Sequence, residues 1–190
     1  LLEYTIQVIP MKIVLEAFDK YLEDKDMIFS SIVIGATALI VMGVIDRATR
    51  DVDCLAPPIP PEVKAASKSF AVSYNSEDTP RDEAWRNNGP DRLARDLPAG
   101  WQERTVPLFT GKRITLRTLG RLDLLRSKLF AYCDRQQDLE DCLAMQPTLT
   151  ELSECLDWLA ERDLNPLWPK HVHSSLRLLA ERLGYGHDKF

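Results

Sequence analysis

The sequence predicts an α+β fold, in which a mixed sheet flanked by helices is followed by a C-terminal helical bundle. Two apolar or alternating segments, 27–34 and 51–55, have the length and pattern of strands. Thr110-Gly111-Lys112 separates two further strand-like segments, as in a β-hairpin. From Arg121 to the end, apolar residues recur at helical spacing. We therefore predict an α/β core over residues 1–120 and a helical region over 121–190 packed on it.

The elements of the first part follow from local patterns. Met11–Asp24 places its apolar residues on one helical face, and Asp51–Leu55 alternates acidic with apolar residues as a two-faced strand does. Gly35 ends the strand that precedes it. The predicted helices are Met11–Asp24, Thr37–Met42, Glu62–Ser69 and a short one near Asp91–Asp96. The predicted strands are Met27–Ile34, Asp51–Leu55, Trp101–Phe109 and Arg113–Leu119.

The second part reads as helices separated by prolines. Thr150 is predicted to cap one helix, and Pro166 and Pro169 are predicted to interrupt the chain before the last one. Gly184 closes that last helix. The predicted helices lie around Leu122–Tyr132, at Leu139–Met145, from Thr150 to Glu161 and at His171–Leu183.

Composition excludes several classes of protein. Of the 190 residues, 45% are hydrophobic and 28% charged, as in ordinary globular domains. No apolar run reaches the ~18 residues that a membrane span needs, and the first ten residues lack a basic leader. The four cysteines form no C-x-x-C pair, which argues against a zinc ribbon. We expect buried or idle thiols, a cytoplasmic location and no membrane partner.

Charge is unevenly distributed along the chain. The net charge of −5 argues against indiscriminate binding to nucleic acid. Residues 81–135 nevertheless carry 12 basic and 7 acidic side chains. This basic middle segment either accepts phosphate groups or forms a mixed solvated surface, and charge alone does not choose between the two.

The segment 32–55 carries the candidate chemistry. Residues two apart on a strand point the same way, so Asp51 and Asp53 project side by side. Paired carboxylates at this spacing can bind Mg²⁺, which prefers oxygen ligands and phosphate partners. Gly35 allows close approach of the backbone to a phosphate, and the helix that follows would direct N–H groups toward it. A solvated strand end is the alternative for the two aspartates.

Two motifs follow one another along the chain. The first runs Gly35-Ala36-Thr37-Ala38-Leu39 and then Arg47-Ala48-Thr49-Arg50-Asp51-Val52-Asp53. The second runs Asp123-Leu124-Leu125-Arg126-Ser127-Lys128-Leu129-Phe130-Ala131, followed by Arg135 and Asp138-Leu139-Glu140-Asp141. Together they resemble the nucleotidyltransferase superfamily, and more closely its bacterial branch of AbiEii-like toxins and related proteins. The resemblance covers roughly residues 30–145.

The resemblance implies a Mg²⁺-dependent enzyme that moves a nucleoside monophosphate from a nucleoside triphosphate to an RNA or protein acceptor. It implies a toxin-like role and a cognate antitoxin as partner. Asp51 and Asp53 match the family's catalytic metal ligands, with Glu103 as the candidate third acid. The matched or neighbouring nucleotide-binding positions are Gly35, Ala36, Thr37, Arg47, Arg50 and Lys128.

Departures from the family pattern keep a second hypothesis open. Ala36 stands where the family has Ser or Gly, so a hydroxyl is lost there unless Thr37 supplies it. A third carboxylate on a later strand is absent unless Glu103, at the start of the predicted strand Trp101–Phe109, takes that place. The second hypothesis is therefore a catalytically degenerate domain that binds a nucleotide or a partner protein, and a purely structural interaction module is a third. Likewise, Arg47 and Arg50 could neutralise the aspartates, and Lys128 could be an ordinary surface residue.

Overall fold

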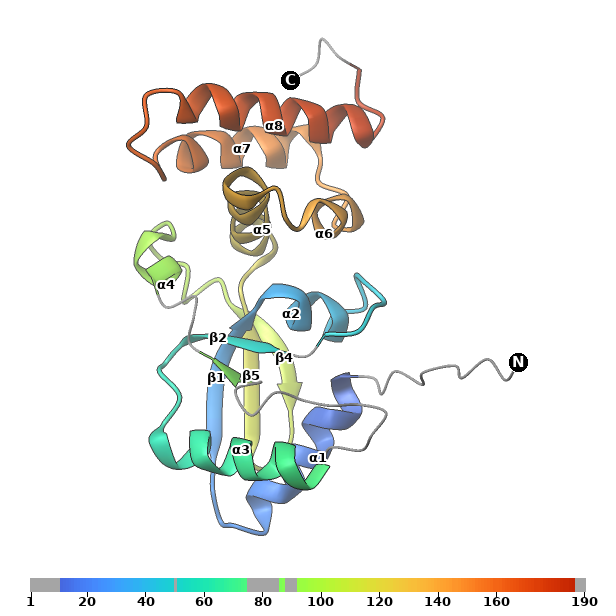
Figure 1. The fold of residues 1–190 in the computed structure, drawn as a ribbon, viewed down its shortest axis with the longest axis vertical. Helices are drawn as coiled ribbons and strands as arrows, with labels where there is room; N and C mark the ends of the chain where they lie inside the picture. Colours follow the sequence, from blue (N-terminus) through green and yellow to red (C-terminus); the bar gives the residue numbers. More distant parts are fainter. Residues whose placement is uncertain (1–10, 50, 75–85, 88–91, 187–190) are drawn as a thin grey trace, which may run out of the picture. The chain divides into compact units, whose positions relative to one another are not determined.

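The computed structural model describes residues 11–49, 51–74, 86–87 and 92–186. The chain divides into two compact units, residues 1–96 with 105–118 and residues 97–104 with 119–190. The first unit is built on a mixed sheet flanked by helices and the second is helical (Figure 1), which confirms the predicted α+β class. No helix in the described ranges combines the length and apolar character that a membrane span requires.

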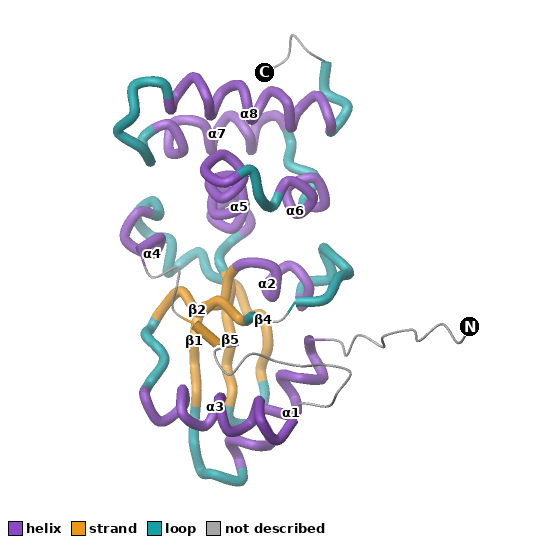
Figure 2. Tube along the Cα trace, in the orientation of Figure 1, coloured by secondary structure: helices purple, strands orange, loops and turns teal. Residues whose placement is uncertain are grey.

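Among the described residues, the sheet of the first unit has five strands in the order β3-β2-β1-β5-β4. Figure 2 shows the strands in orange. Its central strand, β1, pairs antiparallel with β2 and parallel with β5, and β4 and β5 form the predicted antiparallel hairpin. The bounds are β1 Phe29–Ile34, β2 Val52–Ala56, β3 Arg86–Asn87, β4 Val106–Thr110 and β5 Ile114–Thr118.

Two helices of this unit pack against one face of the sheet and form its core. They are α1, Met11–Glu23, and α3, Pro61–Tyr74 (Figure 1). Phe18 and Phe70 contact each other with ring centroids 5.0 Å apart, and Phe18 is fully buried. Burying one such side chain stabilises the fold by roughly 1.5–3 kcal/mol. The shorter helices are α2, Gly35–Val41, and α4, Leu93–Asp96.

The opposite face of the sheet is partly open, with polar side chains at its exposed positions and the buried Ile34 on the same side. Along β5, Ile114, Leu116 and Thr118 are buried, whereas the intervening Thr115 and Arg117 are exposed. The same alternation on β1 and β2 turns Val33, Val52 and Cys54 toward the core and Asp53 to the other side. We call this second side the open face; it carries Ser30, Ile32, Asp53, Thr115 and Arg117.

A single buried carboxylate joins α1 to the β4–β5 hairpin. Asp19 accepts hydrogen bonds from the backbone N–H groups of Lys112, Arg113 and Ile114 at 3.0, 2.9 and 2.7 Å. A Cβ at Gly111 would overlap this carboxylate, so glycine is required there. Burial alone would raise the pKa of Asp19, but the three N–H donors outweigh it and hold the pKa below its ordinary value.

The second unit packs four helices around its own core. They are α5 Arg121–Arg135, α6 Leu139–Ala144, α7 Leu149–Ala160 and α8 Trp168–Arg182. Leu125, Leu152 and Leu176 are fully buried, and the Trp168 indole donates to the Leu159 carbonyl at 2.8 Å. All four cysteines of the chain are free and buried, as predicted. Burial raises the pKa of Cys133 to about 12, so this thiol is inert at neutral pH.

Several predicted element bounds were wrong, each for a local reason. The first hairpin strand begins at Val106 rather than Trp101, because Arg104 bonds the carbonyls of Pro98 and Ala99 and holds 99–104 in turns. The cap of α7 is Thr148, not Thr150. Its hydroxyl accepts from the Glu151 N–H, and the Glu151 carboxylate accepts from the Thr148 N–H.

Two helices extend beyond their predicted ends. Helix α3 continues to Tyr74, because Phe70 and Ala71 remain on its buried face. Helix α8 begins at Trp168, so Pro169 lies in its first turn instead of interrupting the chain. Proline is tolerated there because the first N–H groups of a helix have no intrahelical partner.

Candidate functional site

The pairing of β1 with β2 brings Gly35 against Asp53. Asp53 lies opposite Ile34 in the antiparallel register, and Gly35 follows Ile34 directly. Gly35 has φ +74°, a conformation that favours glycine. A Cβ at this position would lie 2.6 Å from Oδ2 of Asp53, which is closer than any real contact. The glycine predicted from the sequence is thus required by its neighbour as well as by its backbone.

Asp51 is held through its main chain. The hydroxyl of Thr37, which is 1% exposed, donates to the Asp51 carbonyl at 2.6 Å. This bond ties the first turn of α2 to the residue that precedes β2. Thr37 was predicted as a nucleotide ligand that could replace the missing hydroxyl at Ala36. The contact that the structure gives it is with Asp51, and direct binding to a nucleotide stays a prediction.

Asp51 and Asp53 lie at one end of the open face with different exposure. The Asp51 side chain is exposed and that of Asp53 is half-buried. Within the described part of the chain, no group of three or more His, Cys, Asp or Glu side chains is arranged to hold a metal ion. Two carboxylates nevertheless suit Mg²⁺, which commonly binds one or two protein carboxylates and completes its shell with phosphate oxygens and water.

The remaining predicted residues of the first unit lie near α2. Ala36 is half-buried in the first turn of this helix, and Arg47 is exposed in the connector between α2 and β2. Arg50 lies outside the described residues. Ile34, the residue before α2, has no polar side chain to cap the helix.

Two predicted site residues belong to the second unit. Glu103 is exposed in the turns before β4 and is not on a strand. Lys128 is 4% exposed on α5, and its Nζ lies 2.7 Å from Asp141 Oδ2 and 3.3 Å from Asp138 Oδ1. Lys128 is therefore a buried, doubly paired lysine and not a surface residue. The catalytic role of Glu103 and the nucleotide-binding role of Lys128 stay predictions.

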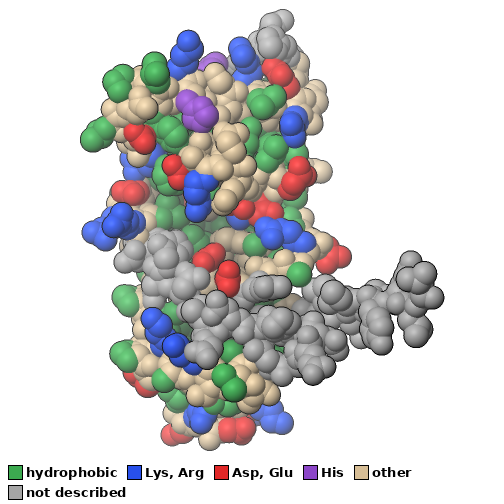
Figure 3. All heavy atoms as spheres, viewed as in Figure 1, with side chains coloured by type: hydrophobic (Ala, Val, Ile, Leu, Met, Phe, Trp, Pro, Cys, Tyr) green, Lys and Arg blue, Asp and Glu red, His purple; other side chains and the backbone are tan. Residues whose placement is uncertain are grey.

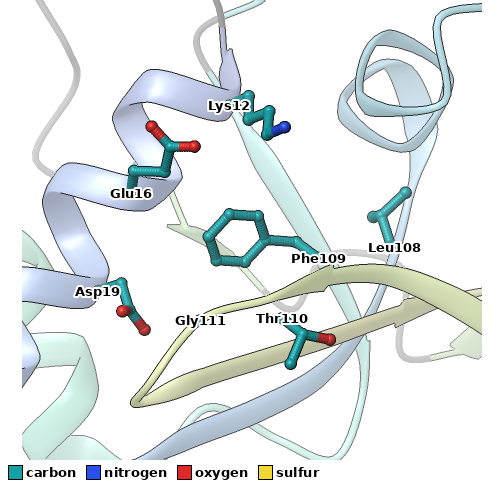
Figure 4. Close-up of a pocket in the computed structure, with 7 residues that line it drawn as sticks. All are labelled: Lys12, Glu16, Asp19, Leu108, Phe109, Thr110 and Gly111. Atoms are coloured by element: carbon teal, nitrogen blue, oxygen red, sulfur yellow. The ribbon is translucent and has the colours of Figure 1, made fainter.

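A pocket of about 440 Å³ lies between α1 and the β4–β5 hairpin (Figure 4). Lys12, Glu16 and Asp19 of α1 line it together with residues 108–111 of β4 and its turn. Strand β4 is an edge strand at the end of the sheet away from β2. Asp19 already accepts three N–H groups, so its carboxylate is engaged in holding the hairpin. The pocket contains none of the predicted site residues.

The open face carries a cation that the sequence patterns did not single out. Arg117 is exposed, and its guanidinium donates from Nε to the Thr105 hydroxyl at 2.8 Å and from Nη2 to the Thr105 carbonyl. The alternation of apolar and polar residues over 114–118 is a sequence signal that could have placed Arg117 on the exposed side of this strand. On the side of the molecule drawn in Figure 3, basic and acidic side chains are interspersed rather than separated by sign.

Comparison with known proteins gives one family. Residues 11–160 match the family model Nucleotidyltransferase of unknown function (DUF6036). The matched stretch is most of the chain and contains Gly35, Asp51, Asp53 and Lys128. No curated protein and no solved structure is significantly similar to the chain.

Proposed function

The chain belongs to the DUF6036 family of nucleotidyltransferases of unknown function, and from this we propose that Asp51 and Asp53 form the catalytic centre of nucleotide transfer. The substrate would be a nucleoside triphosphate, and the acceptor a hydroxyl group on RNA or protein. The observation that carries the proposal is the close approach of the Asp53 carboxylate to Gly35, where a Cβ would lie 2.6 Å from Oδ2, at one end of the open face.

The proposed reaction is the transfer of a nucleoside monophosphate with release of pyrophosphate. An acceptor oxygen attacks the α-phosphorus, and the bond from that phosphorus to the bridging oxygen of the leaving pyrophosphate breaks. The acceptor hydroxyl loses its proton to solvent or a neighbouring carboxylate, so charge and atoms balance. Asp51 and Asp53 would hold the metal. Gly35, having no side chain, leaves room for the Asp53 carboxylate and for a phosphate beside the backbone.

The donor set fits the implied Mg²⁺. Both side chains are carboxylates, which are hard oxygen ligands, and they project from one side of the start of β2. When bound, the metal would neutralise the triphosphate charge and lower the barrier to attack and departure at phosphorus. A third protein carboxylate is not required for such binding, and Glu103 is the candidate for that position.

Thr37 is proposed as a positioning residue that acts through Asp51. Thr37→Val keeps the volume but removes the hydroxyl that donates to the Asp51 carbonyl. We expect kcat of transfer to fall by roughly tenfold with KM for the triphosphate little changed, because a lost hydrogen bond of about 1 kcal/mol loosens the carboxylate. Thr37→Ser should restore kcat, whereas Thr150→Val, at an exposed hydroxyl of the second unit, should not change it. Equal loss in Thr37→Ser and Thr37→Val would contradict the role.

A second candidate function has its own support. Ala36 lacks the family's hydroxyl, and the described residues hold no group of three or more His, Cys, Asp or Glu arranged to bind a metal ion. A degenerate domain that binds a nucleotide without transferring it would have these features. It predicts Asp53-dependent binding of a triphosphate with no labelled product.

The test is transfer of radiolabel from each of the four α-labelled ribonucleoside triphosphates in the presence of Mg²⁺. Total cellular RNA and total cell protein serve as acceptors. We expect a labelled product with one acceptor class and none with the Asp51→Ala/Asp53→Ala double variant. That variant must first show wild-type circular dichroism and melting. A product that survives in a folded double variant would refute the assignment of this centre.

The finer points belong to the same proposal. A labelled RNA product would identify RNA as the acceptor, and a labelled protein product would identify protein. The motif resemblance is the support for the AbiEii-like relationship, for a toxin-like effect and for a cognate antitoxin. The cytoplasmic location is inferred from the composition. Growth arrest on expression, absent with the double variant, is the corresponding measurement for the toxin-like role.

A further inference from the structure

We propose that Arg117 binds the triphosphate of the incoming nucleotide at the open face, as a substrate-binding residue additional to those of the family motifs. The inference rests on the proposed function, because it assigns a second anchor to the same nucleotide. It is carried by the strand register, by the contacts of the guanidinium and by the absence of an acidic partner for it among the described residues.

The register places Arg117 and Asp53 on the same side of the sheet. Asp53 lies opposite Ile34, and Arg117 lies beside Ile32. Ile32 and Ile34 are two residues apart on β1 and therefore point the same way. Paired residues on neighbouring strands also share a face. Asp53 and Arg117 consequently both project from the open face, on either side of β1.

The two residues are also close to the same end of the sheet. Strands β1 and β5 run parallel, so their C-terminal ends lie together, and Gly35 follows β1 while Arg117 is the penultimate residue of β5. Strands are ~4.8 Å apart and rise ~3.3 Å per residue. Two strand spacings and two residues of offset put the Cα atoms of Asp53 and Arg117 roughly 12 Å apart. A nucleotide held at one end by a metal on the aspartates can reach the arginine with its phosphates.

The charge of Arg117 is not neutralised by the groups that hold it. The hydroxyl and the carbonyl of Thr105 accept from its Nε and Nη2, and Thr105 is 7% exposed. Both acceptors are neutral. The neighbouring cations of the hairpin are paired with acids, Lys112 with Glu23 at 3.0 Å and Arg113 with Asp26 at 3.0 Å. Arg117 has no carboxylate within ion-pair distance in the ranges that the structure describes.

This arrangement suits a phosphate group. Guanidinium groups have five N–H donors in a planar fork, and Thr105 engages only two of them here. Because Thr105 already fixes the guanidinium, binding an anion costs less side-chain entropy than it would for a freely rotating arginine. A charge-assisted bond to phosphate is about twice as strong as a neutral one. The exposed hydroxyls of Ser30 and Thr115 make the surrounding face polar, as an anion site requires.

The test is equilibrium binding measured by calorimetry with Mg²⁺ present. The proteins are the wild type, Arg117→Ala, Arg117→Lys and Asp51→Ala/Asp53→Ala, with Arg113→Ala as matched control. The ligands are the preferred ribonucleoside triphosphate, the corresponding monophosphate and a short single-stranded RNA. Arg113 is an arginine at the opposite end of β5, so it controls for the loss of one positive charge. Circular dichroism melting of each variant checks that the fold survives the loss of the side-chain contacts with Thr105.

We expect Arg117→Ala to weaken triphosphate binding by roughly tenfold, the loss of one charge-assisted contact. Arg117→Lys should recover part of that loss because it keeps the charge. Monophosphate binding should be unchanged in both variants, and Arg113→Ala should bind the triphosphate as the wild type does.

Three results with the Arg117 variants or their ligands would overturn the inference. They are unchanged triphosphate affinity in a folded Arg117→Ala protein, an equal loss for the monophosphate, and a loss confined to RNA. If Asp51→Ala/Asp53→Ala binds the triphosphate as tightly as the wild type, or if neither binds it, the proposed function fails together with this inference. Triphosphate binding that depends on the aspartates but not on Arg117 leaves the proposed function intact and rejects only Arg117.

Discussion

Gly35→Ala is expected to lower nucleotide transfer on the order of 100-fold, because the added methyl group displaces the Asp53 carboxylate. The Cβ would lie 2.6 Å from Asp53 Oδ2, so the carboxylate must rotate or shift. The backbone contributes a second penalty, since φ +74° costs a residue with a side chain roughly 1–2 kcal/mol. Transfer of α-label and thermal melting, measured on the same sample, separate these two effects.

Gly43→Ala provides the matched control for the backbone effect. Gly43 follows α2 with φ +73°, almost the same conformation, but nothing lies within 4 Å of the position of its Cβ. It should lose a similar amount of stability and retain transfer. If Gly35→Ala and Gly43→Ala lose stability equally and both keep transfer, the contact between Gly35 and Asp53 has no catalytic importance.

Asp19→Ala is expected to destabilise the first unit by about 2–4 kcal/mol. The substitution leaves the N–H groups of Lys112, Arg113 and Ile114 without their acceptor, and the last of these bonds is fully buried. An unsatisfied buried donor costs roughly 1–3 kcal/mol. Far-UV circular dichroism in urea reports the loss, and hydrogen exchange at residues 111–114 should show it locally. Wild-type exchange rates at residues 111–114 of the variant would contradict the stabilising role of the Asp19 carboxylate in the hairpin.

Two further variants sharpen this result. Asp19→Asn keeps one acceptor oxygen and should lose less stability than Asp19→Ala. Glu23→Ala removes only an exposed pair with Lys112 and should stay within about 0.5 kcal/mol of the wild type.

The contribution of Asp19 should also depend on pH. Its pKa is lowered in the fold, so its stabilisation is fully present above the ordinary aspartate pKa of ~3.9 and is lost as pH falls through the lower, folded value. The difference in stability between wild type and Asp19→Asn should therefore shrink in acid below about pH 3.9. A difference that grows in acid would show that the carboxylate is not held as the anion.

Much of the local structure could be predicted from periodicity. The hairpin around Gly111 and the helix from Met11 were expected within a few residues of where they lie. One signal was present but misassigned. Thr148 and Glu151 have the spacing of a capping box, and Thr148 rather than the predicted Thr150 caps α7. Strand onset at Val106 could not be predicted, because the turns before it depend on contacts of the Arg104 side chain.

The sequence by itself predicted that Asp51 and Asp53 project together, because a strand repeats every two residues and both acids lie within one short segment. The structure places Asp53 in β2 and Asp51 directly before it. The sequence also determined that Gly35 ends β1, and its motifs indicated the family. The tertiary structure decided which groups meet across the sheet: Gly35 with Asp53, Thr37 with Asp51, and Arg117 on the same open face. Strand register joins segments far apart in the chain, and local periodicity contains no information about that pairing. For the same reason only the fold could show that Asp19 holds a turn more than ninety residues away.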